Sequence, residues 1–380
     1  MRAYLDHAAT TPMVPAAVTA WLEVAEAGEG NPTGMHAEAR RARRRLDDAR
    51  DLLALHLGAA PGEVVLTSGG TESDNLAVFG VLGACAGPPG PIVCAAFEHH
   101  AVLRACRGAA ERFGIELREV GATADGTLDL DGLAGALSPD VSLVSVMLVN
   151  NEVGTVQPLA EVAALVRRRS PGARLHTDAV QAVPWLDVAL AGEVADLVSV
   201  SAHKFGGPVG AGALVVRDGV ALAPLLHGGG QERRRRSGTQ AVAAAWSTAV
   251  ALEAAAERRR AAPEVAGRRD RLVDGILAAV ADVVETVPRA TTAAGFAHLV
   301  VEGVESEALL VVLDELGVAA SAGSSCASGA AEPSHVLLAM GRPASDARSA
   351  LRLTLASTTT DEEVDLALVA VPEAVRRLRD

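Results

Sequence analysis

Seven short apolar segments, most of them separated by helical patterns, constrain the fold of this chain more than any other feature. Amphipathic patterns lie at roughly 72–86, 100–113, 130–137 and 159–169. Strands that are apolar on both faces and alternate with helices are typical of a mainly parallel sheet covered by helices. The sequence therefore predicts an α/β fold. The expected strands are EVVLTS (63–68), PIVCAAF (91–97), IELREV (115–120), SLVSVMLV (142–149), ARLHTDA (173–179), DLVSVSA (196–202) and GALVVR (212–217).

The pattern changes after residue 238, where long helices are predicted at roughly 238–260 and 263–285. They are followed by an apolar segment at 297–304, a helix near 305–316, the strand LRLTLA at 351–356 and a closing helix. This change predicts a second, smaller α+β domain joined by a long helix. The expected division is a large domain at 13–255 and a small domain made of 1–12 and 256–380.

Charge and composition exclude several classes of protein. The net charge of −13 argues against general nucleic-acid binding, which needs a basic face. The sequence has no apolar run long enough to cross a membrane and no apolar core of a signal peptide at its start. Its cysteines form no CxxC pair and no zinc-type spacing, so we expect a cytoplasmic protein with reduced thiols and no metal site. Cys94, in a strand, and Cys85 and Cys106, in helices, are expected to be small buried apolar residues.

Lys204 is the only lysine in a chain whose other basic residues are all arginine. Arginine serves salt bridges and phosphate contacts at least as well as lysine. It cannot lose its proton and attack a carbonyl, whereas lysine can do so once its pKa is lowered. Lys204 therefore either occurs by chance in a composition strongly biased towards arginine, or is required here for amine chemistry.

The residues that follow the predicted strands favour the second interpretation, because ligands of parallel sheets bind at the carboxyl ends of strands. SGGTESDN follows the first strand, with two glycines, Thr71 as a candidate helix cap and Asp74 three residues later as in a capping box. Such a stretch either binds a phosphate group at the start of a helix or simply forms a capped turn. His99 follows the second strand, and an isolated histidine there is usually structural. Asp178 lies in an apolar run, where a carboxylate needs a cationic partner. The other polar residues at strand ends are Asn150, Asn151, Gln181, Ser201, His203 and Lys204.

A phosphate cup, an imidazole, an amide, a carboxylate and a single amine together match the needs of pyridoxal phosphate, which requires a lysine and an acidic partner for its ring nitrogen. A nucleotide-binding oxidoreductase is the alternative from the same features, but no GxGxxG follows any predicted strand. A metal hydrolase lacks support, because the sequence has no HExxH motif and no carboxylate cluster.

The chain resembles the cysteine desulfurases, which belong to the class V aminotransferases among the fold-type I pyridoxal-phosphate enzymes. The matching stretches run in the family's order over nearly the whole chain. They are YLDHAATTP (4–12), GNPTGMH (30–36), TSGGTESDN (67–75), EHHAVL (98–103), NNEVG (150–154), HTDAVQ (176–181), SAHKFGGPVGAGAL (201–214), HGGGQERRRRSGT (227–239), SAGSSCAS (321–328) and LRLTL (351–355).

The resemblance implies roles for individual residues. Lys204 would bind pyridoxal phosphate as a Schiff base, Asp178 would pair with the ring nitrogen, and His99 would stack on the ring and move protons. Asn31 and Arg352 would hold the substrate carboxylate. The remaining contacts to the cofactor would come from Gly70, Thr71, Ser201 and His203 at the phosphate, from Thr239 of a second subunit, and from Asn151 and Gln181 near the phenolic oxygen.

Cys326 separates a desulfurase from an ordinary aminotransferase. It lies in SAGSSCASGA, a run of small residues typical of a loop from which a thiol could reach both a substrate and an acceptor. The resemblance makes Cys326 the nucleophile, and the length of its segment is that of the long-loop group. Arg352 also has a plain alternative: the leucines of LRLTLA alternate, so Arg352 and Thr354 could simply face solvent.

The resemblance implies that L-cysteine is converted to L-alanine and that its sulfur passes to Cys326 as a persulfide. The expected partners are a second copy of the chain and a sulfur acceptor, either an iron–sulfur scaffold, whose cluster the Cys326 persulfide could contact transiently, or a tRNA-thiolation carrier. No nucleic acid or membrane partner is expected. A selenocysteine lyase, another class V enzyme or an inactive scaffold remain alternatives.

Overall fold

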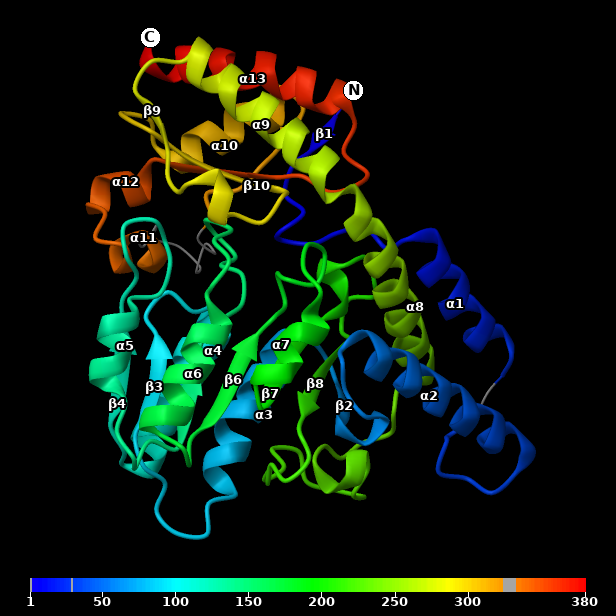
Figure 1. The fold of residues 1–380 in the computed structure, drawn as a ribbon. Coiled ribbons are helices and arrows are strands. Elements are labelled where there is room, and N and C mark those ends of the chain that lie inside the picture. The colour runs from blue at the N-terminus through cyan, green and yellow to red at the C-terminus, as the bar shows by residue number, and fades with distance from the viewer. Residues whose placement is uncertain (1, 29, 324–332) are drawn as a thin grey trace.

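The computed structural model describes residues 2–28, 30–323 and 333–380. Its largest element is a seven-stranded sheet in the order β2-β8-β7-β6-β5-β3-β4 (Figure 1). Neighbours from β7 to β4 pair in parallel, whereas β8 is antiparallel to β7 and β2. This sheet confirms the predicted mainly parallel α/β fold. Its strands are β2 (Val64–Thr67), β3 (Ile92–Ala95), β4 (Leu117–Val120), β5 (Leu143–Ser145), β6 (Arg174–Asp178), β7 (Leu197–Ser201) and β8 (Gly212–Val216).

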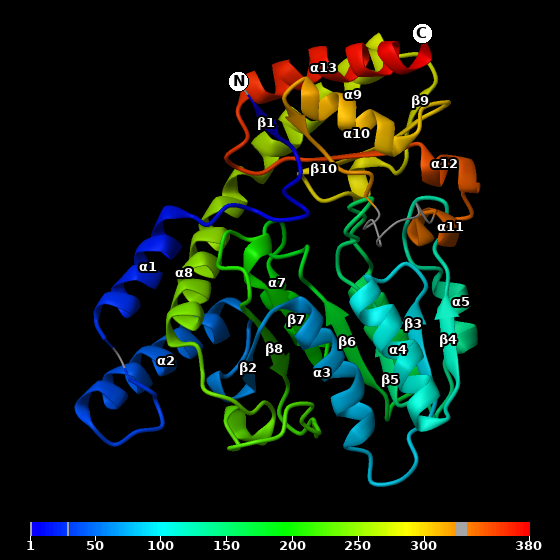
Figure 2. The same ribbon diagram turned by 180° about the vertical axis from the view of Figure 1, so that it is seen from behind.

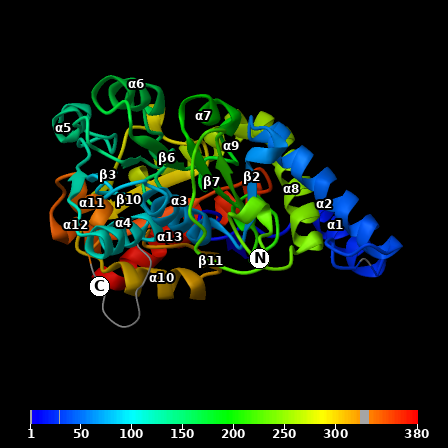
Figure 3. The ribbon, with the colours of Figure 1, turned by 90° about the horizontal axis from the view of Figure 1, so that it is seen from below.

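Helices cover both faces of this sheet, with α5, α6 and α7 on one side and α3 and α4 on the other (Figures 2 and 3). Helices α1, α2 and α8 pack together beside its β2 end (Figure 1). The arginine run of α2 is largely exposed while Ala42 and Leu46 are buried, so the arginines form the solvated face of this helix. The helices are α1 (Pro15–Glu26), α2 (Ala37–His56), α3 (Gly70–Gly83), α4 (His100–Phe113), α5 (Leu130–Ala136), α6 (Leu159–Arg169), α7 (Val188–Val194) and α8 (Val242–Arg258).

A smaller unit is built on a three-stranded antiparallel sheet in the order β12-β10-β9. Strand β1 (Ala3–Tyr4) joins this unit by pairing in parallel with β11 (Val318–Ala319). Leu5 packs in the same apolar cluster as Leu299 and Leu353, apart from the core of the large sheet. The domain limits at 12/13 and 255/256 stay predictions. The other elements are α9 (Ala262–Ala279), β9 (Val283–Glu285), β10 (Phe296–Val301), α10 (Ser306–Glu315), α11 (His335–Ala339), α12 (Ala344–Arg348), β12 (Ala350–Thr354) and α13 (Asp361–Arg379).

Two local predictions were wrong. The helix expected at 263–285 ends at Ala279, because Asp282 takes a left-handed conformation (φ +57°) and β9 then pairs with β10. Helix α3 ends at Gly83, so Cys85 lies after the helix and is exposed. Cys94 and Cys106 are buried as predicted.

Within these three described ranges, no helix combines the length and apolarity needed to cross a bilayer. In the same residues, the His, Cys, Asp and Glu side chains form no cluster of three or more that could hold a metal ion.

Candidate active site

A cavity of about 440 Å³ lies where the carboxyl ends of β6 and β7 meet the N-termini of α3 and α4. The N-terminal arm, through Ala8 and Ala9, and β12, through Arg352, complete its wall. Parallel strands bring their carboxyl ends to one edge of a sheet, so residues far apart in sequence meet there. Ten predicted site residues line the cavity: Gly70, Thr71, His99, Asn151, Asp178, Gln181, Ser201, His203, Lys204 and Arg352.

Lys204 lies just after β7, and its Nζ donates to the carbonyl oxygens of Ala8 (2.6 Å) and Ala9 (2.8 Å). Burial, helped by the charge of Arg352, lowers the pKa of its amine to about 8, although Asp178 and Asp6 act in the opposite direction. Desolvation disfavours a charged amine. The site therefore makes a neutral, nucleophilic amine accessible near pH 8.

Asp178 ends β6 and is buried, and its Oδ1 accepts a hydrogen bond from the backbone N–H of Val180 (2.8 Å). Burial raises the pKa of this carboxyl to about 6, against the effects of that hydrogen bond and of the Lys204 charge. A cation in the cavity beside Asp178 would stabilise its ionised form. A protonated ring nitrogen is such a cation.

The N-terminus of α3 forms one end of the cavity with Gly70, Thr71, Ser201 and His203. The predicted capping box was wrong. Gly69 is the N-cap at φ +140°, a conformation that favours glycine, and no side chain caps this helix. Thr71 instead lies in the first helical turn, where it lines the cavity beside the free N–H groups of the helix end.

Asp74 is buried within α3, and its Oδ1 lies 3.6 Å from His176 Nε2. This carboxyl also lines the cavity, which the sequence interpretation missed because it assigned Asp74 to a helix cap. A Cβ on Gly70 would lie only 2.9 Å from Val180 Cγ2. Gly70 is therefore needed for the loop after β6 to approach the start of α3 this closely.

His99 is the N-cap of α4, and its Nδ1 accepts a hydrogen bond from the N–H of Ala101 (3.1 Å). Burial, followed by the charges of Lys204, His100 and His335, lowers the pKa of its imidazole to about 4. The ring is therefore neutral at pH 7, and since Nδ1 accepts, Nε2 carries the proton. His99 can donate that proton.

Arg352 is buried on β12, so the alternative that it faces solvent was wrong. Its guanidinium donates to the carbonyl oxygen of Asn151 (2.7 Å) and to Asp6 Oδ1 (2.7 Å). Three buried polar atoms of residues that line the cavity, Arg352 Nε, Asn151 Oδ1 and Asp74 Oδ1, have no hydrogen-bond partner among the described residues. A buried polar group without a partner is costly, so these atoms indicate that a polar ligand binds here.

Two predicted residues, Asn31 and Thr239, do not line the cavity, and a third, Cys326, is not described by the structure. Asn31 is exposed between α1 and α2, where its Oδ1 accepts hydrogen bonds from the N–H (3.0 Å) and hydroxyl (2.8 Å) of Thr33. Thr239 is exposed ahead of α8. Cys326 lies outside the described residues, but Ser321 and Gly323, which precede it closely, both line the cavity. The roles of all three stay predictions.

The N-terminal arm is the part of the site that strand-end reasoning missed. Asp6, Ala8 and Ala9 follow no strand of the large sheet, yet they contact Arg352 and Lys204. The sequence did offer one indication that the arm belongs to the site: the stretch YLDHAATTP matches the family, although the resemblance assigned no role to any of its residues. The arm thus contacts both cationic side chains of the site, Lys204 and Arg352.

Comparisons with known proteins agree with this geometry. The family described as Aminotransferase class-V matches residues 3–367. An "IscS-like cysteine desulfurase" of Mycobacterium tuberculosis is 46% identical, with 99% of this chain and 97% of that protein covered. Among solved structures, a NifS-like protein matches with a TM-score of 0.93 at 32% identity over 100% of both chains. A structure described as "SspA in complex with cysteine" matches with a TM-score of 0.81 at 29% identity, covering 94% of this chain and 100% of that one.

Proposed function

This chain belongs to the aminotransferase class-V family, and we propose that it is a cysteine desulfurase that converts L-cysteine to L-alanine and retains the sulfur as a persulfide on Cys326. The observation that carries the proposal is one cavity that joins Lys204, Asp178 and Arg352 and reaches the chain segment just before Cys326. An ordinary aminotransferase would need the first three residues and no thiol.

The residues of the cavity fit pyridoxal phosphate. Gly70, Thr71, Ser201 and His203 would hold its phosphate, Asp178 would face its ring nitrogen, and Lys204 would hold it covalently. The unpaired Asn151 Oδ1 and the buried carboxyl of Asp178, whose pKa is raised by burial, are polar groups that such a ligand would satisfy. When bound, this cofactor supplies an electron sink that acidifies the substrate α-carbon.

The protein's own groups then divide the work. Arg352, with its Nε unpaired, would bind the substrate carboxylate in a planar, bidentate manner. The neutral Lys204 amine would take the α-proton, and the Nε2–H of His99 would deliver a proton to the reacting substrate. The Cys326 thiolate would attack the substrate sulfur, so that an S–S bond forms and the substrate C–S bond breaks.

The proposed partners follow from the product. A persulfide must be passed on, and we propose a protein acceptor for iron–sulfur cluster assembly or tRNA thiolation in the cytoplasm. We also propose a homodimer, because Thr239 is exposed and does not line its own chain's cavity, and a neighbouring copy would bring it to a cofactor phosphate.

Incubation with L-cysteine tests the function directly. We expect alanine to form in step with protein-bound sulfane sulfur, and with sulfide when a thiol reductant is present. Turnover of L-selenocysteine in parallel tests the alternative of a selenocysteine lyase, which requires that substrate to be strongly preferred. Pyruvate or transamination products without alanine would contradict the proposal.

Replacing Arg352 with lysine should raise KM for L-cysteine by about 10- to 100-fold, because a planar pair of hydrogen bonds to a carboxylate is lost. The matched control is Arg269→Lys, a buried arginine outside the cavity that donates to Asp270 and Phe296. Cysteamine, which lacks the carboxylate, should react equally poorly with wild type and Arg352→Lys. An unchanged KM for L-cysteine would remove Arg352 from substrate binding.

The pH dependence should follow Lys204 rather than His99. Because the base must be neutral, the rate of α-proton removal should rise about tenfold per pH unit below pH 8 and level off above it. His99 is already neutral above pH 4, so it adds no step between pH 5 and 8. The measurement is the rate with α-deuterated L-cysteine across pH 5.5–9.5; a rate that falls as pH rises towards 8 would contradict Lys204 as the base.

A further inference from the structure

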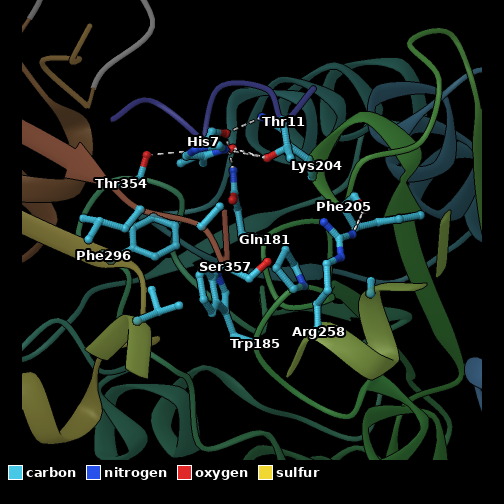
Figure 4. Close-up of a pocket in the computed structure, with 16 residues that line it drawn as sticks. His7, Thr11, Gln181, Trp185, Lys204, Phe205, Arg258, Phe296, Thr354 and Ser357 are labelled. Atoms are coloured by element: carbon cyan, nitrogen blue, oxygen red, sulfur yellow. Dashed lines mark hydrogen bonds between the residues drawn. The ribbon is translucent and has the colours of Figure 1, made fainter. Parts of the chain in front are cut away.

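The backbone of Ala8 is held by three side chains. Its N–H donates to Thr354 Oγ1 (2.9 Å), and its carbonyl oxygen accepts from Gln181 Nε2 (2.8 Å) and from Lys204 Nζ (2.6 Å). Figure 4 shows Thr354, Gln181 and Lys204 reaching the same part of the N-terminal arm from three different elements. The arm at Ala8 is therefore a fixed acceptor for the lysine amine.

Thr354 is the residue of the small unit that holds the Ala8 backbone. It is buried on β12, two residues after Arg352, so both side chains lie on the same face of the strand. Its hydroxyl accepts from Ala8 and also lies 3.5 Å from the carbonyl oxygen of Leu5, to which it can donate. One strand thus supplies both the proposed carboxylate-binding arginine and the anchor of the arm.

Two carbonyl acceptors have a specific effect on a lysine amine. A neutral amine has two N–H donors and one lone pair. When Ala8 and Ala9 accept both N–H groups, as the distances of 2.6 Å and 2.8 Å allow, the lone pair must point away from the arm. Lys204 lines the cavity, so a lone pair that points away from the arm is available to a ligand bound there.

We infer that Thr354 is a positioning residue for the catalytic base: it fixes the Ala8 carbonyl so that the Lys204 amine, when not bonded to cofactor, is held with its lone pair towards the substrate. The inference rests on the proposed role of Lys204. The charged and titratable groups that act on this amine are Asp6 on the arm, Asp178 on β6, Arg352 on β12, His99 before α4 and His203 after β7. A substitution of Thr354 leaves the identity of all five of these side chains unchanged, and the backbone bridge between Asp6 and residue 354 does not use the threonine hydroxyl.

The single lysine makes the test direct. Lysine labelled with ¹³C at Cε gives one signal, from Lys204, in the full-length protein after removal of the cofactor. Its titration reports the pKa of the amine without turnover. Carbonyl acceptors stabilise the ammonium form, so Thr354→Val should lower this pKa by about one unit below its wild-type value near 8.

Matched variants separate positioning from general damage. Thr354→Ser keeps the hydroxyl and should titrate as wild type. Thr248→Val removes another buried hydroxyl, which donates to Ala244 (2.7 Å) in α8, and should also titrate as wild type. Valine has nearly the shape of threonine and favours strands, so the fold should persist. If Thr354→Val nevertheless fails to fold, Gln181→Leu, which removes a competing donor to the Ala8 carbonyl, should raise the pKa.

An equal Lys204 pKa in wild type and Thr354→Val would overturn the inference. The inference would also fail if Thr248→Val or Thr354→Ser shifted this pKa as much as Thr354→Val does. In the cofactor-loaded enzyme above pH 9, where the amine is neutral in both proteins, Thr354→Val should reduce kcat about tenfold with little change in KM, because it affects the orientation of the base and not the carboxylate contact. If the pKa shifts as expected but no alanine forms from L-cysteine in wild type, the positioning role stands and the proposed function fails.

Discussion

Lys204→Arg should yield a protein without the visible absorbance of bound pyridoxal phosphate and with L-cysteine turnover reduced by at least about 10³-fold. Arginine keeps the positive charge and the approximate size of the side chain, but its pKa is too high for it to attack a carbonyl or accept the α-proton. The chain has no second lysine that could replace it. Borohydride reduction followed by mass spectrometry should attach the cofactor to wild type and not to the variant.

Two control variants place a lysine elsewhere in the chain, at position 217. Arg217→Lys alters a partly buried arginine that pairs with Glu63 (2.9 Å), outside the cavity, and should leave the absorbance unchanged. The double variant with Lys204→Arg and Arg217→Lys again has one lysine and should stay colourless. Absorbance and alanine formation that survive in Lys204→Arg would show that the amine is not the attachment point.

Cys326→Ser should lower alanine formation from L-cysteine by about 10⁴-fold or more while leaving the cofactor bound, because a hydroxyl cannot accept the substrate sulfur. Mass spectrometry should detect one added sulfur on wild type and none on the variant. Cys85→Ser, which changes the exposed Cys85 thiol, should retain both turnover and the added sulfur. Alanine and sulfide release that continue in Cys326→Ser would instead favour another class V reaction.

Much of the fold could be predicted because its information is local. The strands of the large sheet fall within the predicted apolar segments, and the four helical patterns between them are all helices. Since parallel strands direct their carboxyl ends to one edge, nine of the ten predicted site residues in the cavity meet there, including the single lysine; the tenth, Arg352, comes from the small unit. Residue type then indicated the cofactor, because a buried carboxyl and a single lysine at neighbouring strand ends are the groups that pyridoxal phosphate requires.

The failed predictions share a physical cause. The alternation in LRLTLA predicts one solvent-facing side, but Asp6 and Ser321 pair with β12 across long sequence separations and bury Arg352 and Thr354. Thr71 is a good capping residue by type, yet the close approach of Val180 and Ser201 places the helix start at Gly69 and Gly70. Local propensity is a weak preference that tertiary packing overrides.

The sequence by itself determined the sheet, its helices and the kinds of chemical group that gather at the strand ends. These properties depend on periodicity and residue type, which act within a few residues along the chain. The tertiary structure alone decided how the amine is held, because Lys204 and Ala8 are 196 residues apart and Ala8 and Thr354 are 346 apart. No local pattern encodes such a contact: it exists because packing of the small unit against the large sheet places the N-terminal arm between two cationic side chains.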